Sequence, residues 1–159
     1  MAFDKIDNIP SNVTFLADQD PMSMRVSIPH NGFNVLCLNI RSVFKNFDTL
    51  YSTLGTYRLE NYFTVIVLTE CWLQKNSIVP SLPGYCFASA SSYLNKSSGI
   101  VIFTHSSLKV VSIEDQCDKV DMLNVILRHE LGLLRLSGIY KSPQLKNCEL
   151  LKHIIRRMK

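Results

Sequence analysis

Short apolar runs alternate with polar turns along this chain. Asn34–Leu38 and Phe63–Leu68 are aliphatic or β-branched and too brief for a buried helix, so we predict both as core strands. Between them, apolar residues recur at intervals of three and four, which predicts an amphipathic helix that starts near Ser42 as its cap. The residues of this pattern are Phe44, Phe47, Leu50, Tyr51 and Leu54, followed at the same spacing by the charged Arg58.

Strands dominate the remaining pattern. A turn at Pro80–Gly84 precedes Tyr85-Cys86-Phe87-Ala88, and strands are then predicted at about 100–104, 108–113, 122–128 and 133–140. Gln144–Met158 has one apolar face among lysines and arginines, which predicts an amphipathic helix. A strand–helix–strand start followed by a meander fits one half of an α/β sandwich, in which two sheets pack face to face with helices outside. Residues 1–32 are of mixed polar character and lack periodicity. This pattern predicts a loose leader at 1–32 before a domain at 33–159.

Polar groups follow the first two predicted strands. Asn39-Ile40-Arg41-Ser42 comes after the first, and Thr69-Glu70-Cys71-Trp72-Leu73 comes after the second. Ligand sites in open α/β sheets lie at the carboxyl ends of strands. Glu70 there suits Mg²⁺, which prefers carboxylate oxygen, and Asn39 could hold a phosphate oxygen.

Simpler interpretations stay open for these residues. Polar side chains commonly cap strand ends, Ser42 could serve only as a helix cap, and Arg41 could be a solvated turn residue instead of a phosphate contact. We expect Trp72 to pack in the core behind the site instead of stacking on a base.

Four segments together resemble the endonuclease/exonuclease/phosphatase superfamily, and within it the endonuclease domain of non-LTR (LINE-type) retrotransposons. They are Leu38–Ser42, Leu68–Leu73, Ser98–Phe103 and Ser137–Pro143, in the order that the family's N-terminal half shows. The resemblance implies the N-terminal portion of a four-layer α/β sandwich (DNase I-like), with mixed, mostly antiparallel sheets and outer helices.

The resemblance also implies roles for individual residues. Glu70 would bind the metal, Mg²⁺ with Mn²⁺ as an alternative, and Asn39 would position metal and scissile phosphate. Tyr140 would hydrogen-bond the phosphate as charge builds, although a strand-end aromatic can also simply pack. Arg41 and Lys141 would bind substrate; Lys141 stands where such sequences often carry arginine. DNA is the implied substrate.

The family's C-terminal half supplies a Gly-Asp-Phe-Asn segment, a further aspartate and a Ser-Asp-His, which include the general base. Neither Gly-Asp-Phe-Asn nor Ser-Asp-His occurs in this sequence. Because general-base help is worth about 10²–10⁴-fold, we expect little or no catalysis by this chain alone. We also expect an uncovered apolar sheet face, which an additional protein segment would complete.

Composition adds only coarse limits. The 159 residues are 47% hydrophobic, enough for one core, and the net charge of +4 is compatible with nucleic acid without indicating it. The five cysteines are widely spaced, with no Cys-x-x-Cys motif. No apolar stretch is long enough to span a membrane, so we expect a nuclear or cytoplasmic protein. Glycine spacings exclude nucleotide-binding loops of the GxGxxG or P-loop type.

Two functions from different classes remain. The first is part of a Mg²⁺-dependent endonuclease that nicks target DNA for retrotransposon insertion. The second is a catalytically dead remnant, or a module that binds nucleic acid or protein.

Overall fold

The computed structural model describes residues 33–57, 59, 62–93, 95–117, 120–129, 132–141, 144–147, 150, 152 and 154. The elements with described bounds are β1 (Val35–Asn39), α1 (Val43–Thr56), β2 (Val65–Thr69), β3 (Tyr85–Ala90), β4 (Ile100–His105), β5 (Lys109–Cys117), β6 (Val120–His129) and β7 (Gly132–Lys141). Every strand predicted from the sequence is present, most of them longer than predicted. The leader predicted over residues 1–32 lies outside the described residues.

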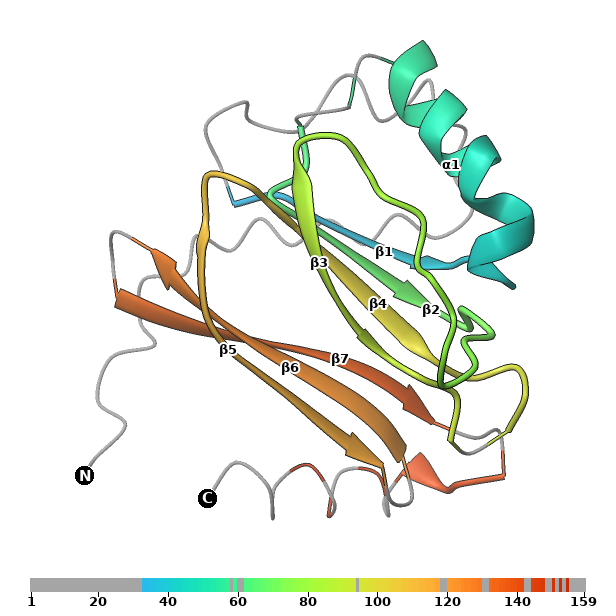
Figure 1. Ribbon diagram of the computed structural model, residues 1–159. Helices are drawn as coiled ribbons and strands as arrows, with labels where there is room; N and C mark the ends of the chain where they lie inside the picture. The colour runs from blue at the N-terminus through green and yellow to red at the C-terminus, as the bar shows by residue number, and fades with distance from the viewer. Residues whose placement is uncertain are drawn as a thin grey trace. The chain divides into compact units, whose positions relative to one another are not determined.

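The strands form two sheets (Figure 1). One has the order β1-β2-β4-β3, in which β1 and β2 are parallel and the other pairs are antiparallel. The other is the antiparallel meander β5-β6-β7. A parallel pair needs a crossover, and α1 supplies it between β1 and β2.

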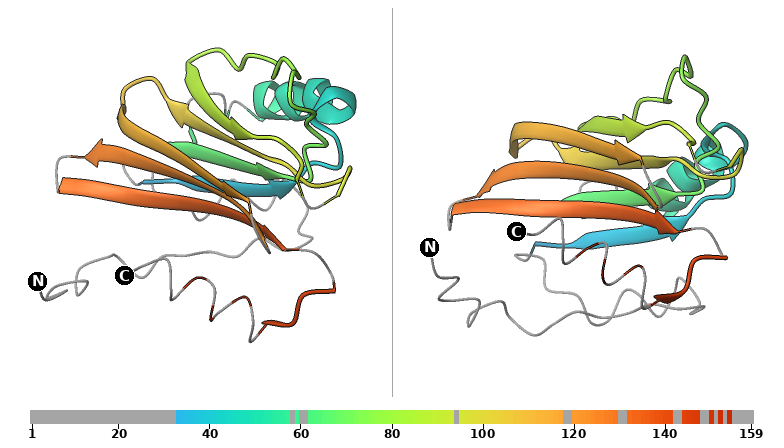
Figure 2. Two further views of the ribbon diagram at one scale, coloured as in Figure 1. Left: turned by 60° about the horizontal axis from the view of Figure 1, so that its bottom comes forward. Right: turned by 90° about the horizontal axis from the view of Figure 1, so that it is seen from below.

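Figure 2 shows the two sheets as stacked layers, with α1 on the side of the four-stranded sheet that faces away from β5–β7. Alternation along β2 explains this arrangement, because successive side chains point to opposite faces. Ile66 and Leu68 pack under α1, whereas Val65 and Val67 pack against the other sheet. The inter-sheet core also contains Ala88, Ala90, Ile100, Ile102, Leu123, Val125 and Leu127.

Helix α1 buries a narrower stripe than the sequence predicts. Val43, Phe47, Leu50 and Leu54 are buried, and the ring of Phe47 lies 6.1 Å from that of Phe103 on β4. The predicted core positions Phe44 and Tyr51 are instead 52% and 46% exposed. A single sheet face accepts one row of side chains spaced three and four apart, so the flanking aromatic residues remain outside.

Two expectations about the sheets are wrong. β1 is not a core strand: it pairs only with β2 among the described strands, and four of its five residues are exposed. The face of the four-stranded sheet that was expected to lie bare is covered, because β5, β6 and β7 form a second sheet within this chain. Exposed apolar side chains remain at the β1 edge, where Val35 and Leu38 lie, and also on other strands, such as Ile113 of β5 and Leu133 of β7.

The helix predicted over Gln144–Met158 falls mostly outside the described residues. Within it, Asn147, Leu150, Lys152 and Ile154 are helical. None of the helices in the described part of the chain has the length and apolar character needed to cross a membrane.

Candidate functional site

The loops that follow β1 and β2 are bonded to each other through their backbones. The amides of Ile40, Ser42 and Val43 donate to the carbonyls of Thr69, Glu70 and Cys71, at 3.0, 2.8 and 3.1 Å. The ladder between the parallel strands therefore continues beyond the strand ends. Asn39 lies beside Thr69 in the register, so Asn39 and Glu70, which follows Thr69, lie at the same end of the sheet.

A third segment holds the second loop from the other side. The amides of Cys71 and Trp72 donate to the carbonyls of Gly99 and Ser98, at 3.1 and 2.9 Å. Gly99 has a φ of 99° there, and a Cβ would lie 3.0 Å from the Ser92 hydroxyl. Glycine is required at this position by both its backbone angle and the close packing.

Backbone strain is concentrated in these same two loops. Arg41, Ser42, Glu70 and Trp72 have φ values of 48°, 83°, 53° and 56°, and no other non-glycine residue in the described part of the chain has a positive φ. Such conformations cost on the order of 1–3 kcal/mol each and persist where the surroundings enforce them. Strain gathered in two adjacent loops is typical of functional sites.

The same angles show that the prediction for Trp72 is wrong. Its side chain is 43% exposed, whereas Cys71 is completely buried. Left-handed residues on both sides of Cys71 reverse the usual alternation, so the cysteine turns inward. Its thiol lies 3.3 Å from the Leu68 carbonyl, and burial raises its pKa to about 12.

Asn39 and Arg41 belong to one tight turn. The Asn39 side-chain carbonyl accepts a hydrogen bond from the Arg41 amide at 3.3 Å, and both residues are exposed. Ser42 stands at the helix N-cap as predicted, but its side chain makes no capping bond. Asn46 instead fastens the loop to the helix, because its side-chain amide donates to the carbonyls of Ile40 and Arg41, each at 2.8 Å.

Tyr140 and Lys141 end β7 in the second sheet. The arrows of β1, β2 and β7 point to the same side of the sandwich (Figure 1), so Tyr140 approaches the side where Asn39 and Glu70 lie. Its ring packs against the inter-sheet core. The Lys141 ammonium group donates to the Leu145 carbonyl at 2.9 Å, so this cation is held by the following turn.

Asp121 was missed by the sequence reasoning. Asp121 pairs with Tyr140 across β6 and β7 and is fully buried, and neither carboxylate oxygen has a hydrogen-bond partner among the described residues. A buried carboxylate without a partner is costly and therefore uncommon. The available signal was a single acidic residue inside the otherwise largely apolar strand Val120–Leu127.

A groove of about 430 Å³ runs along the edge where β1 and β7 face each other. Its lining consists of Val35, Cys37, Leu38 and Asn39 of β1, Val67 and Thr69 of β2, and residues 136–139 of β7. Asn39 and Thr69 form its polar end. Apart from Ser137 and Gly138, the rest of the lining consists of apolar side chains from the two sheets.

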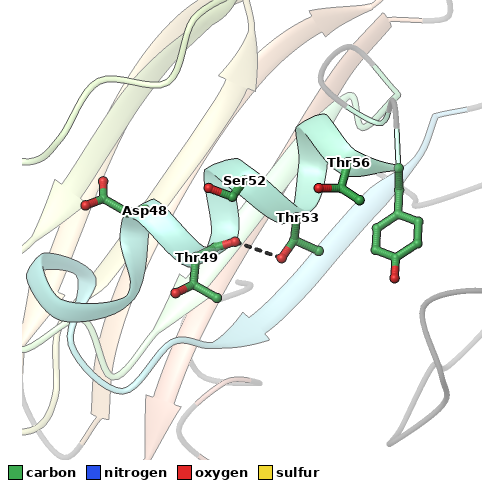
Figure 3. A pocket seen from close by; sticks show the side chains of 6 residues that line it. Asp48, Thr49, Ser52, Thr53 and Thr56 are labelled. Carbon is green, nitrogen blue, oxygen red and sulfur yellow. Dashed lines mark hydrogen bonds between the residues drawn. The ribbon is translucent and has the colours of Figure 1, made fainter.

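A second depression, of about 470 Å³, lies on the exposed side of α1 (Figure 3). It is lined by Asp48, Thr49, Ser52, Thr53, Thr56 and Tyr57. The Thr53 hydroxyl donates to the backbone carbonyl of Thr49 at 2.7 Å, within the helix itself. None of the predicted site residues reaches this depression, and we assign it no function.

The described residues contain no group of three or more His, Cys, Asp or Glu side chains arranged for a metal. Magnesium does not require one, because it usually keeps several waters and takes one or two protein oxygens. Glu70 supplies a hard carboxylate and Asn39 an amide oxygen. This donor set fits Mg²⁺ better than a softer metal such as zinc, which favours cysteine and histidine.

No family model matches this sequence, and no curated protein sequence matches it. Among solved structures it is similar to D. rerio TDP2, described as complexed with a single-strand DNA product, with a TM-score of 0.55 and 14% identity. The match covers 78% of this chain and 53% of the TDP2 chain, so this chain spans about half of that protein. The likeness shows the fold: an α/β sandwich of the DNase I-like type.

Proposed function

We propose that this chain is the N-terminal portion of a Mg²⁺-dependent phosphodiesterase domain that acts on DNA. The observation that carries the proposal is the pair of strained, cross-bonded loops that present Asn39 and Glu70 at one edge of the sheet. The fold shared with TDP2, whose structure contains a DNA product, supports the same class of reaction.

Each residue has a distinct part in this proposal. Glu70 and Asn39 would hold the metal, which supplies positive charge where a phosphodiester develops negative charge. The Tyr140 hydroxyl would donate a hydrogen bond to a phosphate oxygen, and it approaches from the opposite sheet. Arg41 is exposed in the turn beside Asn39 and can contact the DNA backbone.

Lys141 contributes less in this arrangement. Its ammonium group is engaged by the Leu145 carbonyl, so its contact with substrate would require that bond to be exchanged. We assign it a secondary role in holding the segment after Tyr140.

The resemblance of four motif segments supports a finer assignment, to the endonuclease domain of non-LTR retrotransposons. On this proposal the complete domain nicks target DNA, and the 159-residue chain alone does not, because it lacks the general base. The alternative is a catalytically dead remnant, or a module that binds nucleic acid or protein. The mild positive charge and the exposed Arg41 are compatible with that alternative.

A thermal-melt titration tests the metal site without requiring catalysis. Mg²⁺ should raise the melting temperature of the wild-type chain, because a ligand at a hundred times its Kd stabilises by about 2.7 kcal/mol. Glu70→Gln should abolish the shift. Glu114→Gln is the matched control, since Glu114 is an exposed carboxylate on β5 that pairs with Arg135 at 2.8 Å.

DNA binding is measured on the same proteins by fluorescence anisotropy at several salt concentrations. Salt-dependent binding that Mg²⁺ strengthens in the wild type, but not in Glu70→Gln, supports the phosphodiesterase assignment. Salt-dependent binding with no Mg²⁺ effect favours the binding module. A Mg²⁺ shift that survives Glu70→Gln would show that the metal binds elsewhere and would end the proposal.

A further inference from the structure

The loop that follows β2 and the loop between β3 and β4 are bonded to each other. Both lie at the end of the sheet where β1 and β2 terminate, because β3 runs parallel to β2 (Figure 1). The backbone amide of Ser92 donates to the Leu73 carbonyl at 2.8 Å. Trp72 and Tyr93 each adjoin one of these two residues in the sequence, so their side chains start from neighbouring points of the backbone.

Each of the two loops exposes an aromatic side chain and, three residues later, a lysine. Trp72 and Tyr93 are 43% and 66% exposed. Lys75 follows in the first loop and Lys96 in the second, and both are exposed. Residues 71–113 contain no aspartate or glutamate, so no carboxylate from this stretch neutralises the two lysines.

The backbone holds both aromatic residues on ordered loops. Trp72 has a φ of 56°, and Cys71 occupies the core in its place. A tryptophan ordinarily stabilises a fold by entering the core, so a backbone that directs it to solvent favours a binding role. In the second loop, the hydroxyls of Ser92 and Ser98 donate to the carbonyls of Ser98 and Asn95, at 2.6 and 3.0 Å. Ordered loops lose little conformational freedom when a ligand binds.

We propose that Trp72 and Tyr93 form an aromatic platform on which unpaired bases of single-stranded DNA stack, while Lys75 and Lys96 bind its phosphates. The choice of DNA as the ligand rests on the proposed function. Aromatic side chains stack on the flat face of any base, and neighbouring cations follow the phosphate backbone. In a duplex the neighbouring base pairs cover those faces. The platform therefore selects a strand that is unpaired beside the candidate site.

Fluorescence of the wild-type chain tests the stacking directly, because Trp72 is the single tryptophan of the sequence. The probe is an oligothymidylate of about ten nucleotides. Its control is an oligomer of the same length made of abasic sites, which carries the same phosphates without bases. Both are titrated in EDTA, so that the proposed metal site does not contribute. The oligothymidylate should quench the Trp72 emission and bind at least about fivefold more tightly than the abasic oligomer.

Variants separate stacking from charge, with binding measured by the anisotropy of a labelled oligomer. Trp72→Ala and Tyr93→Ala should each weaken oligothymidylate binding about 5–150-fold, whereas Tyr93→Phe, which keeps the ring, should bind like the wild type. Tyr51→Ala is the matched control and should change nothing, because it removes a 46% exposed tyrosine from α1. Lys75→Gln and Lys96→Gln should each reduce the slope of log affinity against log salt by about 0.7 and preserve the quenching at saturation.

Two results would overturn the inference, and both are obtained on the wild type even if a variant fails to fold. The first is an unchanged Trp72 emission at millimolar oligothymidylate. The second is equal binding of the abasic oligomer, or equal quenching by a duplex of the same length. These results are distinct from a failure of the proposed function. Quenching in EDTA combined with a Mg²⁺ shift that survives Glu70→Gln would end the proposed function and support the platform.

Discussion

Gly138 lies where β7 packs tightly on the four-stranded sheet, and a methyl group added there should destabilise the fold. A Cβ at this position would lie 2.9 Å from Ile100 Cγ2 and 3.3 Å from both Ile102 Cδ1 and Val67 Cγ1. All three neighbours belong to the four-stranded sheet. Ile100 is β-branched and fully buried, so its Cγ2 cannot rotate away without leaving its rotamer.

The magnitude follows from two opposed effects. Overpacking a buried site costs about 1–3 kcal/mol. Replacing glycine by alanine restricts the unfolded chain, which returns about 0.4–1 kcal/mol. We therefore expect Gly138→Ala to lower the free energy of unfolding by about 1–2 kcal/mol, which corresponds to roughly 2–8 °C in melting temperature for a chain of this size.

Urea unfolding with a double-mutant cycle tests the reasoning. Ile100→Ala removes the methyl group that the new side chain would strike, so the double variant should be more stable than the sum of the single effects by at least about 0.5 kcal/mol. An unchanged slope of the unfolding free energy against urea concentration would confirm that the folded and unfolded states of the variants are as compact as those of the wild type. A stabilised Gly138→Ala, or strictly additive effects, would show that β7 does not contact Ile100.

Three further predictions concern single side chains. Asp121→Asn should raise the free energy of unfolding by about 1–3 kcal/mol in urea, because it removes a fully buried carboxylate whose oxygens have no partner in the described part of the chain; a loss of stability would show that the folded chain stabilises this carboxylate. Glu70→Gly should stabilise the chain by about 0.5–1 kcal/mol through relief of the left-handed backbone, while it abolishes the Mg²⁺ shift; an unchanged melting temperature would argue against stored strain. The Tyr85 hydroxyl donates to the Phe63 carbonyl at 2.6 Å and burial raises its pKa to about 12, so its contribution is complete below pH 10 and is lost as the pH rises toward 12. Tyr85→Phe should therefore lose stability at pH 7 but show a smaller decline across that range in thermal melts; an identical decline would assign the pH dependence to other groups.

The local sequence pattern predicted the burial of a strand correctly where both faces of that strand are covered. β2 is buried on both faces, and its continuous aliphatic run identified it correctly. β1 has a similar aliphatic run, yet its exposure depends on where the second sheet ends. The local sequence pattern of β1 does not contain that information. Its exposure is a property of the assembled layers.

The sequence likewise predicted where the loops of the candidate site lie, but not how all of their side chains are oriented. Strand ends with polar residues identified the loops of Asn39 and Glu70, because parallel neighbours must end at a common edge. Trp72 was misplaced because alternation was assumed to continue through Glu70 and Cys71, whereas two left-handed residues interrupt it. In a sequence, glycine is the residue that indicates a positive φ, and neither Glu70 nor Trp72 is a glycine.

The different connectivity of the two sheets has a consequence for the order in which the chain folds. β5, β6 and β7 are neighbours both in sequence and in space, so each pairing closes a short loop. β2 must instead find β1 across α1 and β4 across the whole of β3. Loop closure costs more entropy as the loop lengthens, and contacts between distant segments slow folding. The meander should therefore form first and give β4 and β2 an apolar surface on which to assemble, so that the loops of Asn39 and Glu70 are among the last parts to take their final form.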